Sequence, residues 1–237
     1  METDEYCRQI EAHLCRSNAG HLVRISGPAF DTVCGWAAMG VPLKVAFQGI
    51  DRHVQRVAAK GGSRRPVRIE FCEADVLEAF DAWRRAVGVR ATADPEGGGD
   101  EAPETTPRRR PSLSTHIDRV IVRLTALRTG PSPLSEWDAA LDQVVRRLDA
   151  LHPLARNARG PAREPLMAEL GALDARLIES ARAAVGDAEA AEIRREADDE
   201  LEPFRGRMPA DAYRAAHQRC TDRILRERLA LPVLAVD

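Results

Sequence analysis

Apolar residues recur along this chain at the three- and four-residue spacing of α-helices. The clearest example runs from residue 43 to residue 57, where the apolar positions fall on one helical face: Leu43, Ala46, Phe47, Ile50, Val54 and Val57. Pro42 suits the first turn of such a helix, and Gly61 and Gly62 end it. The first 90 residues are organised around this helix.

Three more helices are expected in the same part of the chain, over residues 4–17, 26–40 and 73–87. Ser26 is expected to cap the second, with Phe30 and Val33 facing inward. Acidic residues near the start of the third and Arg84 and Arg85 near its end suit the helix dipole. The short stretches 21–26 and 67–71 read as extended, so a small strand pair could accompany the helices.

From Ser112 onward the pattern is helical throughout. Two helices carry apolar residues at spacings of three and four, which favours an antiparallel bundle. Their members are Trp137, Leu141, Val144, Leu148 and Leu151, then Leu166, Leu170, Leu173, Leu177 and Ala181. A charged helix over 187–201 and a last helix to about Leu229 follow.

Residues 91–111 differ in composition from both flanks. Pro, Gly, Thr and acidic residues dominate, and no apolar residue is larger than alanine. Ordering this segment would therefore bury too little apolar surface to offset the loss of conformational entropy. The expected organisation is all-α: an N-terminal helical domain over 1–90, a flexible linker over 91–111 and a C-terminal helical bundle over 112–237.

Composition agrees with this organisation. Apolar residues make up 44% of the chain and aromatic residues only 4%, which favours aliphatic helix packing over a β-sandwich. The five cysteines are scattered, which argues against a disulfide framework. No secretory leader or membrane-spanning run is recognisable, so a cytoplasmic protein without membrane contact is expected.

Catalytic and cofactor-binding motifs are not apparent. His217 and Cys220 share a helix face but lack further metal ligands at suitable spacing. The acidic residues beside Cys72 would raise its pKa, which disfavours a nucleophile. Asp198, Asp199 and Glu200 look like a solvated face. We therefore expect no enzyme activity, no cofactor and no metal.

A basic row is the strongest functional indication. Arg52, Arg56 and Lys60 repeat every fourth residue, and no acidic residue lies between Arg52 and Ile69. Such a row can bind phosphates. The candidate nucleic-acid-binding residues are Arg52, Arg56, Lys60, Arg64, Arg65 and Arg68. The alternative is an ordinary solvated surface, which we expect if Glu70, Glu73, Asp75 and Glu78 fold back onto the arginines.

Residues 30–83 carry a further pattern: Phe30 with Trp36, Gly40-Val41-Pro42-Leu43, Ala46 with Ile50, and Val76 with Phe80 and Trp83. This pattern resembles the DnaD/DnaB-like domain of bacterial and phage replication-initiation proteins. The resemblance implies a helical module that oligomerises, binds DNA and takes part in primosome assembly.

Two functions follow as expectations. The first is a non-enzymatic nucleic-acid-binding protein, such as a DNA replication accessory factor, whose C-terminal helices mediate self-association or partner binding. The second is a protein–protein adaptor or scaffold with no nucleic-acid binding. The sequence leaves DNA and RNA equally open, because base readout depends on geometry.

Overall fold

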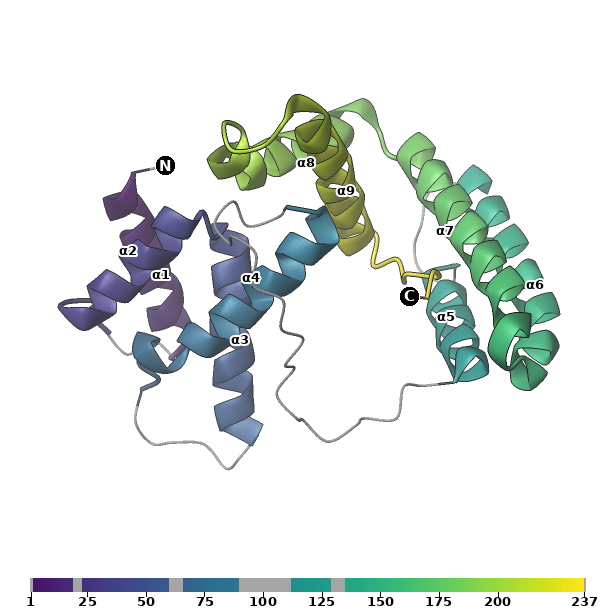
Figure 1. The fold of residues 1–237 in the computed structure, drawn as a ribbon, viewed down its shortest axis with the longest axis horizontal. Helices are drawn as coiled ribbons and strands as arrows, with labels where there is room; N and C mark the ends of the chain where they lie inside the picture. Colours follow the sequence, from purple (N-terminus) through teal and green to yellow (C-terminus); the bar gives the residue numbers. More distant parts are fainter. Residues whose placement is uncertain (1, 19–22, 60–65, 90–111, 129–134, 237) are drawn as a thin grey trace. The chain divides into compact units, whose positions relative to one another are not determined.

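The structure is a computed structural model of the 237-residue chain, and it describes residues 2–18, 23–59, 66–89, 112–128 and 135–236 (Figure 1). Every regular element within these ranges is a helix, which confirms the all-α class. The chain divides into two compact units, Met1–Ala93 with Ala197–Cys220, and Asp94–Glu196 with Thr221–Asp237. The linker predicted over 91–111 lies outside the described residues.

The first unit begins with four α-helices, whose predicted positions are confirmed closely, and a 3₁₀ turn where residues 67–71 were expected to be extended. They are α1 (Thr3–Ser17), α2 (Pro28–Met39), α3 (Leu43–Ala59), η1 (Ile69–Phe71) and α4 (Glu73–Val87). Helix α3 packs against both α1 and α4. The core between them is mainly aliphatic, with Ile10, Val33, Ile50 and Val76 fully buried.

The start of α2 differs from the prediction. Gly27, not Ser26, occupies the N-cap position, and its positive φ of 60° suits glycine. Phe30 was expected to face inward but is 37% exposed. The inward face of α2 is instead formed by Ala29, Val33 and Trp36, at spacings of four and three residues.

The expected strand pair is absent from the described residues. Asn18 at the end of α1 instead binds the extended backbone at Val67, because its side-chain amide donates to the Val67 carbonyl at 2.9 Å and its oxygen accepts from the Val67 N–H at 2.7 Å. One side chain thus satisfies the backbone groups that a neighbouring strand would have paired.

Residues 197–220 complete the first unit. They comprise the end of α8 (Asp187–Leu201), the turn η3 (Glu202–Phe204) and most of α9 (Ala210–Arg228). The buried ring of Phe204 lies 5.6 Å from Trp83 and 6.4 Å from Phe80, centroid to centroid. These residues were expected in the C-terminal bundle, whereas the aromatic contacts of Phe204 are with α4.

The second unit contains α5 (Leu113–Arg128), α6 (Ser135–Asn157), the turn η2 (Gly160–Arg163) and α7 (Glu164–Ala184). Helix α6 packs against both α5 and α7, and the predicted three-four seams of α6 and α7 are buried as expected. The segment after α9 is held here, since Asp174 accepts hydrogen bonds from Arg226 at 2.6 Å and from the Leu234 N–H at 2.8 Å.

Candidate functional site

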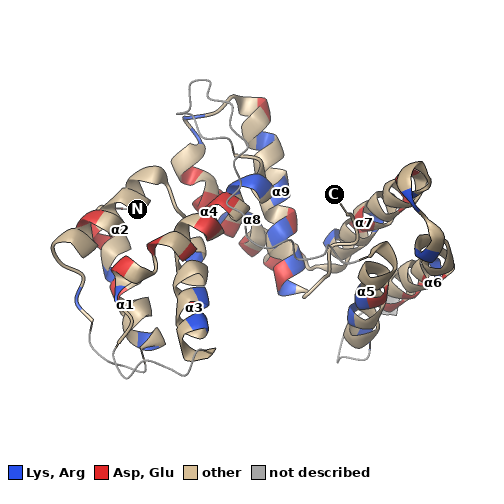
Figure 2. Ribbon diagram, turned by 60° about the horizontal axis from the view of Figure 1, so that its bottom comes forward, with Lys and Arg blue, Asp and Glu red and all other residues tan. Residues whose placement is uncertain are grey.

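The close approach of α3 and α4 determines the surroundings of the predicted basic row. Gly49 makes this approach possible, because a Cβ atom there would lie only 2.5 Å from the Cα of Val76. The acidic first half of α4 therefore lies beside α3, which carries the basic residues (Figure 2).

Each predicted phosphate contact within the described residues has a carboxylate partner. Arg52 pairs with Glu78 at 3.2 Å, Arg56 with Asp75 at 2.6 Å, and Arg68 with Glu70 at 2.8 Å. The other three candidates, Lys60, Arg64 and Arg65, lie outside the described residues. The described part of the row is therefore a set of ion pairs.

These ion pairs differ in burial. Asp75 is 1% exposed, and its Oδ2 also lies 2.8 Å from His53 Nδ1, so one buried oxygen has two partners on α3. Arg52 and Arg68 instead pair with acids at the surface, where such bridges stabilise by only about 0–1 kcal/mol. The Asp75 pair is structural, while the other two are easily exchanged for another anion.

Cys72 precedes α4 and is fully buried. Burial raises the pKa of its thiol to about 12, and the charges of Asp75 and Glu70 act in the same direction. The direction expected from the sequence is confirmed. A thiol with this pKa is protonated at neutral pH and unsuited to nucleophilic attack.

The acidic group predicted to be solvated over 198–200 is partly buried. Glu200 is 6% exposed, and its Oε2 accepts a hydrogen bond from Trp83 Nε1 at 2.8 Å and from the Cys220 thiol at 3.4 Å. The prediction was wrong for Glu200 because its partner on α4 lies 117 residues away in sequence. Asp198 remains at the surface and pairs with His217 at 3.3 Å.

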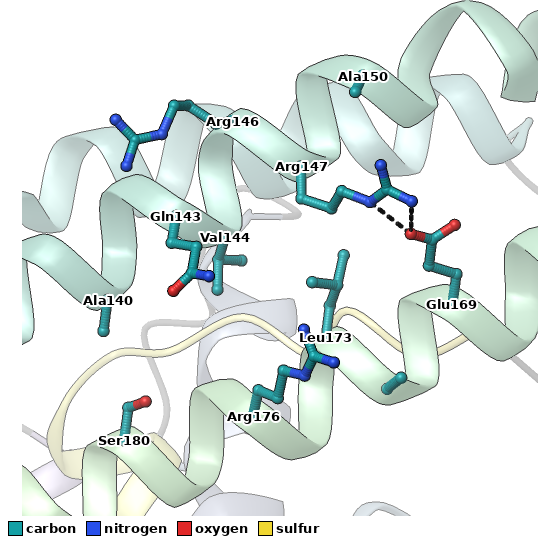
Figure 3. Close-up of a pocket in the computed structure, with 11 residues that line it drawn as sticks. Ala140, Gln143, Val144, Arg146, Arg147, Ala150, Glu169, Leu173, Arg176 and Ser180 are labelled. Atoms are coloured by element: carbon teal, nitrogen blue, oxygen red, sulfur yellow. Dashed lines mark hydrogen bonds and ion pairs between the residues drawn. The ribbon is translucent and has the colours of Figure 1, made fainter.

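A groove in the second unit was not foreseen from the sequence. It lies between α6 and α7 and has a volume of about 380 Å³ (Figure 3). Its lining combines small residues, arginines and two buried aliphatic side chains, Val144 and Leu173. The signal that could have indicated it is the pair Arg146-Arg147 on α6 together with Arg176 on α7.

The arginines of this groove differ in their partners. Arg147 forms an ion pair with Glu169 across the gap between the two helices (Figure 3). Arg146 and Arg176 are exposed, and within the described part of the chain neither has a hydrogen bond or ion pair. The groove therefore offers two cationic groups to a ligand.

Comparisons with family models, curated proteins and solved structures gave no match for this chain. Among the residues that the structure describes, no three His, Cys, Asp or Glu side chains are placed to hold a metal ion. No helix in those ranges is both long and apolar enough to cross a membrane. The resemblance to the DnaD/DnaB-like domain stays a prediction.

Proposed function

We propose that this protein is a non-enzymatic protein–protein interaction adaptor that binds its partner through the C-terminal helices. The observation that carries this proposal is the α6–α7 groove, where Arg146 and Arg176 are exposed and lack partners among the described residues. Unpaired arginines beside buried aliphatic side chains are common at protein interfaces.

The ion pairs of the basic row support this choice over nucleic-acid binding. An ordinary protein surface was expected if the acids of residues 70–78 fold back onto the arginines of the basic row. Glu70, Asp75 and Glu78 each pair with one arginine of the row. A phosphate would have to displace these carboxylates, so the described part of the row has little net positive charge.

Site-specific photo-crosslinking in the source cells tests the adaptor proposal. A photoreactive amino acid replaces Ala172, which lines the groove, or Thr125, which is exposed on α5 outside it. We expect a discrete crosslinked protein at position 172 and none at position 125, identified by mass spectrometry. No crosslinked protein at either position, or the same set at both, would contradict the proposal.

Nucleic-acid binding through the basic row is the second candidate. The favouring observation is that Arg52 and Arg68 remain about half exposed or more and pair only with surface carboxylates. A nucleic-acid phosphate could replace Glu78 or Glu70 at low energetic cost. Under this proposal the protein would be a DNA-binding replication accessory factor, as the resemblance implies.

Binding of labelled single- and double-stranded DNA across a salt series tests this second candidate. If it is correct, binding falls steeply with salt and is lost when Arg52, Arg64, Arg65 and Arg68 are changed to Ala, a set that leaves the structural Arg56–Asp75 pair intact. Changing Arg119 and Arg123 on α5 to Ala is the matched control, since both are exposed arginines of the other unit. No binding at low salt would exclude the candidate.

A further inference from the structure

The α6–α7 groove combines an apolar floor with a charged rim. Val144 from α6 and Leu173 from α7 are 6% and 5% exposed and form its apolar part. The sides of the groove are low because they include alanines with short side chains: Ala140 and Ala150 on α6 and Ala172 on α7. A volume of about 380 Å³ holds a few side chains of a ligand rather than a whole element.

The rim has an excess of positive charge. Three arginines, Arg146, Arg147 and Arg176, line the groove together with a single carboxylate, Glu169. Since Glu169 pairs with Arg147, the charges of Arg146 and Arg176 remain uncompensated within the described residues. Gln143 and Ser180 also line the groove and offer neutral hydrogen-bonding groups (Figure 3).

This arrangement matches the general way in which a groove receives an amphipathic helix. The apolar side chains of the ligand helix enter the groove at positions i, i+3 or i+4 and i+7, and its flanking charges meet the rim. A rim that is positive selects carboxylates by charge complementarity, which also disfavours basic helices.

We propose that the α6–α7 groove docks an acidic amphipathic helix of a partner protein. Its aliphatic side chains contact Val144 and Leu173, and its Asp or Glu residues pair with Arg146 and Arg176. This inference rests on the proposed adaptor function and names the chemistry of its partner. The apolar floor favours such a helix over a nucleic acid, because phosphates gain nothing from contact with buried aliphatic groups.

The test uses the full chain and a fluorescent synthetic helix of about 15 residues, with leucines at i, i+3 and i+7 flanked by glutamates. A second peptide carries lysine in place of each glutamate. Fluorescence anisotropy gives the Kd of each. We expect the acidic peptide to bind and the lysine peptide to bind at least about tenfold more weakly.

Charge reversal locates the binding site. The variant R146E/R176E should weaken acidic-peptide binding by about tenfold or more, because it turns two attractions into repulsions. The variant R119E/R123E is the matched control: it makes the same charge change at two exposed arginines of α5 outside the groove. We expect it to leave the Kd within about twofold, and circular dichroism verifies that both variants keep their helices.

Several results would overturn the inference. The first is equal affinity for the two peptides, and the second is an equal loss of peptide affinity in both charge-reversal variants. The third is displacement of the acidic peptide by labelled DNA whose own binding is lost in R146E/R176E. A dimer in sedimentation that R146E/R176E dissociates, without peptide binding, would assign the groove to a second copy. If a partner crosslinks at position 172 but no acidic peptide binds, the adaptor proposal stands and the acidic helix is wrong.

Discussion

Gly49 lies at a close contact between α3 and α4, and we predict that Gly49→Ala destabilises the first unit. The new Cβ would meet backbone atoms of Val76 at 2.5 and 2.7 Å, so the helices must separate. Such overpacking costs about 1–3 kcal/mol, more than the gain in helix propensity of about 1 kcal/mol. Urea unfolding followed by circular dichroism measures the change.

Gly35 provides the matched control for this substitution. It is an exposed residue of α2, and a Cβ there would meet nothing within 4 Å. Gly35→Ala should therefore stabilise the protein by up to about 1 kcal/mol. Equal effects of the two substitutions would show that the close approach of α3 and α4 does not depend on glycine.

Asp75 is predicted to matter more for stability than the other acids of α4. Asp75→Ala leaves His53 and Arg56 without their buried acceptor and should cost about 1–3 kcal/mol. Glu78→Ala removes only the surface partner of Arg52 and should cost under about 1 kcal/mol. Urea denaturation midpoints of the two variants measure the two losses of stability. A similar loss of stability in both would contradict a structural role for Asp75.

Cys72 should make stability fall at alkaline pH. Its folded pKa of about 12 lies above the value of about 8.5 for an unfolded thiol. Its contribution is therefore complete below about pH 8.5 and is lost as pH rises towards 12, by at most about 1.4 kcal/mol per pH unit. The free energy of unfolding, measured in urea at about pH 8 and pH 10, should fall less steeply in Cys72→Ala than in the wild type; equal slopes would contradict the shift.

The burial of individual charged residues was the part of the site that the sequence could not provide. The row Arg52–Arg68 has no acid within it, so its charges look uncompensated along the chain. In the structure, Asp75 and Glu78 reach Arg56 and Arg52 from the neighbouring helix. Local spacing predicts which side chains share a helix face, but not which face of another helix lies opposite.

At the scale of elements, prediction was accurate because helix signals are local. The apolar period located α4 over the residues it occupies, the charged helix expected over 187–201 is α8, and the left-handed Gly88 ends α4 as expected. The error at Ser26 and Gly27 also has a local cause, since both residue types can precede a helix. The packing of η3 on α4 was missed because it joins residues more than 100 positions apart.

The contact of η3 with α4 gives a prediction at this scale. Phe204→Ala should destabilise the first unit by about 3–5 kcal/mol, because it removes a buried ring that packs against both Phe80 and Trp83. Phe71→Ala is the control, since Phe71 is 65% exposed and its loss should change stability by less than about 0.5 kcal/mol. Urea unfolding of both variants decides whether η3 contributes to the core.

At the scale of the molecule, the two-unit division differs from a simple order along the sequence. Composition indicated a change at 91–111, and the expected domains were 1–90 and 112–237. Residues 197–220 nevertheless group with residues 1–93, through Trp83, Glu200 and Phe204. The pattern of apolar residues cannot reveal that a late segment packs with an early one, because the apolar stripe of a helix does not specify which helix it packs against.

Because residues 197–220 form one unit with residues 1–93, we predict that two fragments of the chain assemble. Residues 1–111 and 112–237, produced separately and mixed, should form a one-to-one complex, because the second fragment supplies the residues 197–220 that complete the first unit. Size-exclusion chromatography and calorimetry measure the complex. Phe204→Ala in the second fragment should weaken it by about a hundredfold, equivalent to about 3 kcal/mol, whereas Phe71→Ala in the first should change it little. Separate elution of the unmodified fragments would show that residues 1–93 and 197–220 do not depend on one another.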